Sequence, residues 1–171
     1  MHKDIYNYIL HSESVLLDVI DNPFIYIFTR IKDGHKCPKC WDDIRRVSRA
    51  NECLYCYGTG IEGGYNAPEK VKFSHITQVT PVRKETDPRE DGKSIQPINI
   101  WIQNEPLVTV DDIIDIEHIR YNVLNVQQTT MQGGIKQDGT DTIRQILQIQ
   151  ELPAHNIQYK IPLGQFSLER S

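Results

Sequence analysis

All four cysteines lie within twenty residues, as the Cys-x-x-Cys pairs Cys37/Cys40 and Cys53/Cys56. The twelve residues between the pairs fall just short of the usual four-cysteine zinc-ribbon window, but within the range of zinc knuckle pairs in general. Four thiolates can converge on one tetrahedral ion and close its coordination shell, which leaves no position for water or substrate. Zinc accepts such sulfur ligation and needs no redox chemistry. The spacing therefore predicts a structural Zn²⁺ site made by Cys37, Cys40, Cys53 and Cys56.

Other uses of these cysteines fit the sequence less well. Two disulfides would need an oxidising compartment, and no export signal is expected at the N-terminus. An iron site of the rubredoxin kind would accept the same ligands, but nothing else points to electron transfer. A redox dithiol usually has a single Cys-x-x-Cys near a βαβ pattern, which is absent. His35 is near enough to substitute as a ligand, although four thiolates already suffice and a place beside the metal or in solvent is expected.

Basic residues surround the cysteines in the sequence. A zinc ion with four thiolates carries a net charge of about −2, which nearby cations would compensate. The same cations, beside aromatic residues that can stack on bases, could instead form a nucleic-acid patch. The formal net charge of −4 favours local compensation. The cations are Lys36, Lys39, Arg45, Arg46 and Arg49, and the aromatic residues are Trp41, Tyr55 and Tyr57.

Two glycines follow the second cysteine pair, at Gly58 and Gly60. Glycine adopts backbone conformations that other residues avoid, so it lets amide groups turn toward the sulfur atoms. This half resembles one repeat of the zinc module of DnaJ-type chaperones. The first half does not, because Cys40 is followed by Trp41 and no glycine. The resemblance therefore concerns a turn geometry and not a chaperone.

The rest of the chain predicts a mainly β protein. With 171 residues, 39% of them hydrophobic and 25% charged, it suits one domain or one domain with a small metal insert. Residues 1–22 suit a short amphipathic helix that ends at Asn22 and Pro23. Short strands at this rhythm predict a small antiparallel β-barrel or sandwich with an inserted zinc-ribbon-like module. The expected strands are 24–31, 71–79, 98–102, a hairpin over 112–126 that turns at Glu117 and His118, 142–151, and 157–162.

The expected organisation has four parts. Residues 1–33 hold the N-terminal helix and first strand, 34–65 the zinc-binding insert, 66–162 the β-barrel, and 163–171 a C-terminal tail. The polar segments 81–96 and 127–141 are expected to be long exposed loops. In the tail, Phe166 and Leu168 either anchor in a neighbouring subunit or cover their own barrel. No segment has the apolar length needed to span a bilayer.

Nothing in the sequence predicts an enzyme. The densest carboxylate cluster is expected to face water at strand edges, as such residues usually do. No Gly-x-Ser-x-Gly, Walker or dinucleotide motif occurs, and the six histidines lack ligand spacing, with His75 expected on a strand face. A metal-dependent hydrolase would need a second metal site or a catalytic dyad outside the cysteines. The clustered carboxylates are Asp111, Asp112, Asp115 and Glu117.

The C-terminal half carries a resemblance. Residues 106–114 are expected to end a strand, and a hairpin with the pattern Arg120-Tyr121-x-Val123-Leu124 follows an acidic residue. This succession, continued by 146–153 and 155–162, resembles small β-barrel proteins that join head to tail in tailed bacteriophages, the stopper or head-closure class. The stretch 37–65 is similar to a cysteine insert of some phage virion proteins. Together these likenesses cover about two thirds of the chain.

The resemblance implies a structural role without enzymatic activity. Such a protein is made in the host cytoplasm and forms a homo-oligomeric ring in the virion neck that joins the portal and head to the tail and helps close the DNA channel. Its partners would be other copies of itself, a portal or adaptor protein, and tail-terminator or tail proteins. DNA would pass nearby without specific binding, and no membrane would be involved. The alternative is a zinc-ribbon nucleic-acid-binding accessory protein.

Overall fold

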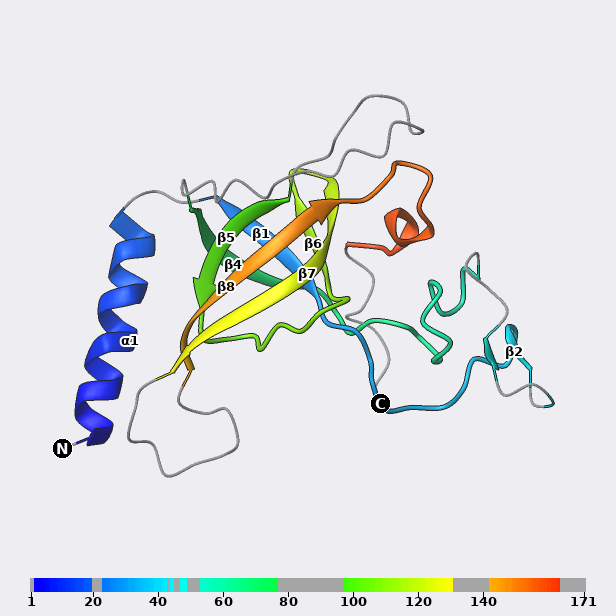
Figure 1. Ribbon diagram of the computed structural model, residues 1–171, viewed down its shortest axis with the longest axis horizontal. Helices are drawn as coiled ribbons and strands as arrows, with labels where there is room; N and C mark the ends of the chain where they lie inside the picture. The colour runs from blue at the N-terminus through cyan, green and yellow to red at the C-terminus, as the bar shows by residue number, and fades with distance from the viewer. Residues whose placement is uncertain are drawn as a thin grey trace, which may run out of the picture.

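The computed structural model describes residues 2–19, 23–42, 44, 47–48, 53–76, 97–130 and 142–163. It is a closed six-stranded antiparallel β-barrel with a helix along one side and the cysteine-bearing segment extending from the other (Figure 1). This confirms the predicted fold class. The barrel strands are β1 (Phe24–Phe28), β4 (Glu69–His75), β5 (Ile98–Gln103), β6 (Ile113–Ile116), β7 (Ile119–Thr130) and β8 (Thr142–Glu151).

The strands follow one another around the barrel in the order β1-β4-β5-β8-β7-β6. The barrel closes because β1 pairs with β4 on one side and with β6 on the other, so Ile27 lies opposite both Glu69 and Ile114. Strands β1, β5 and β8 send apolar side chains inward at alternating positions, such as Ile25 and Ile27, Ile100 and Ile102, and Leu147 and Ile149, as a strand with one buried face requires. The main core is Ile25, Ile27, Phe73, Ile100, Ile102, Val108, Ile114, Val123, Leu147 and Ile149.

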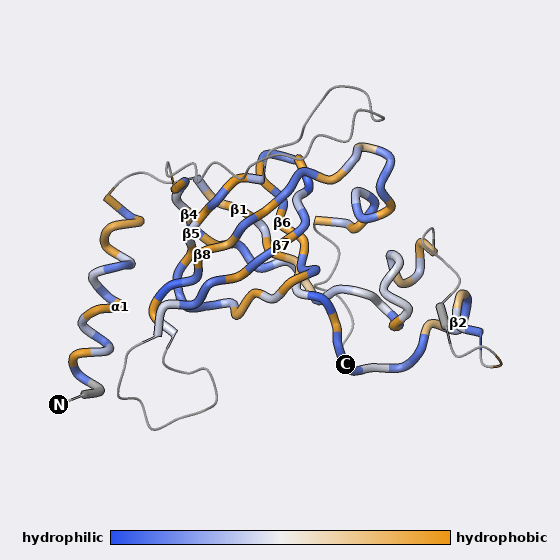
Figure 2. The backbone as a smooth tube through the Cα atoms, in the orientation of Figure 1, coloured by the Kyte–Doolittle hydropathy of each residue, from blue (hydrophilic) through white to orange (hydrophobic). Residues whose placement is uncertain are grey.

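The predicted hairpin and helix are both present. Between β6 and β7, Glu117 and His118 have φ of 51° and 69°, the two positive values that a tight two-residue hairpin turn needs. The helix α1 (His2–Val19) packs across β4, β5 and β8 and buries Leu17. Figure 2 shows hydrophobic residues recurring along α1 and along the barrel strands.

The expected strand 24–31 ends at Phe28 as β1, and three further segments differ from expectation. Residues expected to form a final strand instead make a 3-10 helix, η1 (Ile157–Lys160), because the Asn156 side chain accepts the N–H of Gln158 at 3.0 Å and caps a turn. Strand β7 continues to Thr130, so the first four residues of the expected 127–141 loop belong to the sheet. The segment 106–114, expected to end a strand, is a loop as far as Asp112, and its last two residues begin β6.

A buried glutamine explains the path of that loop. Gln145 projects from β8 into the barrel and is fully buried. Its Oε1 accepts the N–H of Val108 at 2.9 Å. Its Nε2 donates to the carbonyl oxygens of Gln103, Asn104 and Pro106 at 3.1, 3.1 and 2.8 Å. The Gln145 side chain thus provides the hydrogen bonds that a neighbouring strand would otherwise supply. Val108 can therefore enter the core although its backbone is not paired with a strand.

Some expectations lie outside the described residues. These are the cations Arg45, Arg46 and Arg49, the loop 81–96, most of the loop 127–141, and the tail residues Phe166 and Leu168. The division of the chain into four parts stays a prediction.

Candidate metal centre

The four cysteines lie in one cluster, although Cys37 is 16 positions from Cys53 and Cys40 is 16 positions from Cys56. Their Sγ atoms all lie within 4.8 Å of one another. The separation is 3.4 Å between Cys40 and Cys56 and 3.8 Å between Cys37 and Cys53. A disulfide would need about 2.05 Å, whereas four sulfurs around an ion at about 2.3 Å lie roughly 3.8 Å apart. The cluster could therefore hold a metal ion.

Short local structures position each sulfur. The first pair lies in a turn in which the N–H of Trp41 donates to the carbonyl of Cys37 at 3.0 Å. The chain then forms a small two-stranded sheet, in which β2 (Trp41–Asp42) pairs antiparallel with β3 (Val47–Ser48) and leads toward the second pair. The N–H of Cys37 donates to the carbonyl of Gly60 at 2.9 Å, which ties the two pairs together. Residues 34–65 that the structure describes are called the cysteine lobe below.

The glycines after the second pair behave as predicted. Gly58 and Gly60 have φ of 82° and 78°, and their backbone N–H groups hydrogen-bond to the Cys56 thiol. Gly64 also has a positive φ, of 69°, and lies directly against the carbonyl of Cys56. A Cβ atom at Gly64 would come within 2.4 Å of that carbonyl oxygen. Only glycine fits there without movement of the Cys56 backbone.

Burial and hydrogen bonding give the thiols different acidities. Burial raises the pKa of the Cys56 thiol, although the amides of Gly58 and Gly60 oppose it. Burial also acts to raise the pKa of the Cys53 thiol, but hydrogen bonds from the amides of Tyr55 and Cys56 outweigh it and hold this pKa at about 7. N–H groups directed at sulfur stabilise the thiolate, which is the form that binds metal.

The basic and aromatic residues of the lobe pair with each other. The Lys36 ammonium lies 4.1 Å from the centre of the Trp41 ring, and the Lys39 ammonium lies 5.1 Å from that of Tyr55. His35 is exposed and does not belong to the four-sulfur cluster. Its described contact is through its backbone carbonyl, which accepts the N–H of Glu62 at 2.8 Å. His35 is therefore not among the residues that the structure brings to the site.

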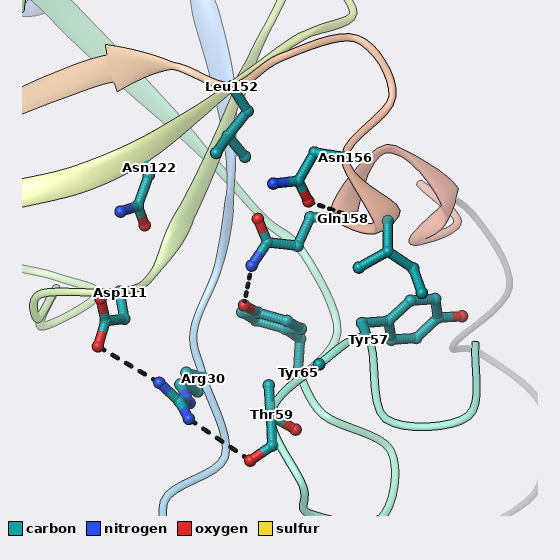
Figure 3. Close-up of a pocket in the computed structure, with 11 residues that line it drawn as sticks. Arg30, Tyr57, Thr59, Tyr65, Asp111, Asn122, Leu152, Asn156 and Gln158 are labelled. Atoms are coloured by element: carbon teal, nitrogen blue, oxygen red, sulfur yellow. Dashed lines mark hydrogen bonds and ion pairs between the residues drawn. The ribbon is translucent and has the colours of Figure 1, made fainter. Parts of the chain in front are cut away.

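A polar joint holds the lobe against the barrel end. The N–H of Arg30 donates to Asp112 Oδ1 at 2.7 Å, and the N–H of Ile31 donates to the carbonyl of Gly64 at 3.0 Å. A cleft of about 440 Å³ lies between the two parts. Figure 3 shows the Arg30 guanidinium reaching Asp111 on one side of this cleft and the Thr59 carbonyl on the other, at 3.3 and 3.5 Å.

The expectation that the four clustered carboxylates face water is wrong for two of them. Asp111 and Glu117 are exposed, but Asp112 and Asp115 are buried. Asp112 accepts hydrogen bonds from Arg30 and Thr109, and burial nevertheless raises its pKa. Sequence patterning missed the role of Asp112 because its partner Arg30 lies 82 residues away, between β1 and the cysteine lobe.

Asp115 forms a buried ion pair. Its Oδ2 lies 2.8 Å from Nε of Arg120, its cross-strand partner, and both side chains are under 5% exposed. Arg120 also donates from Nη2 to the carbonyl of Ile161 at 2.9 Å and lies over the Phe28 ring at 4.3 Å. Burial lowers the Arg120 pKa, while Asp115 opposes this effect. The acid-and-arginine pattern of the hairpin thus fastens the C-terminal segment to the barrel.

Comparisons with known protein families, with curated proteins and with solved structures find no match. Among the described residues, no helix has the length and apolar character needed to cross a membrane.

Proposed function

We propose that the cysteine lobe binds a structural Zn²⁺ and that the chain is a non-enzymatic structural protein of the neck of a tailed bacteriophage. In this proposal copies form a ring that joins the portal and head to the tail and helps close the DNA channel. The main support for this proposal is a cluster of four cysteine sulfurs in a lobe that extends from a closed barrel with a filled core. The sequence resemblance to the head-closure class supplies the biological setting.

Zinc fits the residues present. The donor set is four thiols, and the two measured sulfur separations lie close to those of a tetrahedral sulfur shell. Zinc would supply a cross-link between two turns of a lobe whose described core cluster consists of the cysteines themselves. Such a cross-link replaces the apolar core that a segment of this size cannot build.

The barrel supports a scaffold role. Its interior is filled by core side chains from all six strands, and closure leaves no free edge strand for unwanted pairing. The cysteine lobe and the segment that carries η1 extend from this rigid frame, as ring and neck contacts require (Figure 1). The buried polar groups Asp112, Arg120 and Gln145 are all used to fasten loops.

Metal analysis tests the zinc part. Purified protein should contain one zinc per chain, and Cys53→Ser should lose it while the far-ultraviolet circular dichroism of the barrel persists. His35→Ala is the matched control, because this exposed lobe residue lies outside the cluster, and it should keep full zinc occupancy. Full occupancy in Cys53→Ser would show that the ligand set is wrong.

Particle analysis tests the neck part. The chain should be found in purified virions at a fixed copy number, and electron microscopy should place it as a ring between head and tail. Particles made without it should fail to retain DNA or to join tails. Absence of the chain from purified particles would refute this role whatever the metal content.

The cysteine lobe also supports a second candidate, a zinc-ribbon nucleic-acid binder. Its observation is the two lysine–aromatic pairs on the lobe, Lys36 with Trp41 and Lys39 with Tyr55. This role predicts binding to single-stranded DNA or RNA that weakens steeply as salt rises. No change in fluorescence anisotropy of a labelled oligonucleotide at low salt would eliminate it.

A further inference from the structure

The outer side of α1 carries an apolar stripe that the barrel does not cover. Its members have exposed fractions from 42 to 76%. At about 100° of rotation per residue they fall within an arc of roughly 100° along some 21 Å of helix, with Ser12 between the first two members and the last three. The stripe consists of Ile5, Tyr8, Val15, Leu16 and Val19.

The helix cannot turn this stripe toward its own barrel, because another face is already engaged there. Leu17 is 1% exposed. The Tyr6 hydroxyl donates to the carbonyl of Thr142 at 3.1 Å, and Glu13 pairs with Arg144 of β8. These contacts fix the rotation of the helix about its own axis. Among the residues that the structure describes, none covers the stripe, so it is available to a second molecule.

The stripe is large enough to be an interface. Taking about 200 Å² for the aromatic Tyr8 and about 150 Å² for each of the smaller aliphatic side chains, its exposed parts amount to roughly 450 Å². Single exposed apolar residues are ordinary, but the largest apolar patch of a monomer, typically about 300–600 Å², is often functional. A standard interface buries about 800 Å² on each partner, so the stripe would supply more than half of one side.

A second exposed apolar group lies across the barrel. The helix packs against β4, β5 and β8. In the closed six-stranded barrel the strand opposite β5 is β6, which is three strands away in either direction. On that side Val110 and Leu124 are 51 and 39% exposed. The N–H of Asp111 donates to the carbonyl of Val123 at 3.2 Å, which places Val110 beside β7. Figure 1 shows α1 and the β6–β7 hairpin on opposite sides of the barrel.

We infer that the α1 stripe of one copy packs against the β6–β7 side of the next copy, as a head-to-tail contact. Two apolar surfaces on opposite sides of one rigid barrel cannot meet within a chain. They can meet between copies, and a contact between two different surfaces repeats into a ring or filament. This inference rests on the proposed ring and assigns its subunit contact.

Paired variants test both surfaces by sedimentation velocity over a concentration series. The helix variant is Tyr8→Lys with Val15→Lys, and the barrel variant is Val110→Lys with Leu124→Lys. Wild-type protein should associate as its concentration rises. Each variant alone should show a dissociation constant raised about tenfold or more, because a lysine ammonium would be buried in an apolar contact. Leu54→Lys on the lobe, 57% exposed in the native residue, is the control and should associate like wild type.

The mixture of the two variants decides the geometry. Each retains the surface that the other lacks, so an equimolar mixture should form a heterodimer that does not grow further. Its formation would also show that both variants are folded. Three results would each overturn the head-to-tail assignment. Wild-type protein could stay monomeric at every concentration, the barrel variant alone could associate as strongly as wild type, or the mixture of the two variants could stay monomeric.

These outcomes separate the contact from the proposed function. A failed contact with the chain still present as a neck ring would reject only this surface assignment. Absence of the chain from particles, together with normal heterodimer formation, would reject only the neck role.

Discussion

Two neighbouring glycines allow a sharp test of how the cysteine lobe is built. Gly63 and Gly64 both adopt left-handed backbone conformations, with φ of 79° and 69°. They differ in the space available to a side chain. A Cβ at Gly64 would meet the Cys56 carbonyl oxygen at 2.4 Å and carbon at 2.9 Å, whereas the closest atom at Gly63 is Cδ1 of Ile31 at 3.7 Å, an ordinary contact.

The two alanine substitutions should therefore have different effects. Both carry the left-handed cost for a residue with a Cβ, about 1–2 kcal/mol. Gly64→Ala also forces a backbone displacement, and overpacking of this kind costs about 1–3 kcal/mol more. The displaced group is the Cys56 backbone, so the strain acts directly on a candidate ligand. Since 1.4 kcal/mol is a factor of ten, zinc affinity should fall roughly 5- to 30-fold in Gly63→Ala and about 30- to several thousand-fold in Gly64→Ala.

Competition with a chromophoric chelator measures this affinity, because metal binding and lobe folding are coupled. Circular dichroism should show the barrel intact in both variants, since neither glycine lies in a barrel strand. Equal loss of affinity in the two variants would refute the argument from the Cys56 contact. Wild-type affinity in Gly64→Ala would refute the described path of the lobe.

Three further predictions concern the buried polar groups and are measured by urea denaturation. Arg120→Met should lower the free energy of unfolding by about 3–5 kcal/mol because it leaves Asp115 buried and unpaired; the double variant with Asp115→Val should recover most of this loss, and failure to recover would show that the ion pair is not the cause. Gln145→Leu should cost about 3 kcal/mol by stranding the Val108 amide and its neighbours, whereas Gln148→Leu on the outer face should change stability by less than about 0.5 kcal/mol. Burial raises the pKa of Asp112 above 3.8, so the folded state binds the proton more tightly and the stability contributed by Asp112 decreases as pH rises through this raised pKa. The free energy of unfolding of wild type relative to Asp112→Asn should therefore decrease as the pH rises above about 4, and a constant or growing difference would contradict the shift.

The sequence predicted the features that follow from local pattern. Alternating apolar residues in 98–102 and 142–151 gave strands at the observed places, because one face of a strand must be buried. Two Cys-x-x-Cys pairs predicted one sulfur cluster, because each pair forms a turn that directs both thiols the same way. The segment 157–162 was predicted wrongly, since a short alternating run does not exclude a capped 3-10 turn.

The buried polar contacts could not be predicted in this way. Asp112 and Gln145 resemble surface residues in sequence, and they are held by partners that lie 82 residues away for Asp112 and 37 to 42 residues away for Gln145. Asp115 has a near partner in Arg120, but its burial depends on the closed barrel. The same holds for α1, whose amphipathic pattern did not reveal that one apolar face would be covered and a second left exposed.

The sequence by itself determined the sulfur cluster, the strand pattern and the tight hairpin turn, because each depends on residues close together in the chain. Only the tertiary structure decided which carboxylates are buried, how the lobe is fastened to the barrel end, and which side of the helix remains available. Those properties depend on how closure of the barrel brings distant strands and loops together, and hydrogen bonds and desolvation at these junctions have no local signature in the chain.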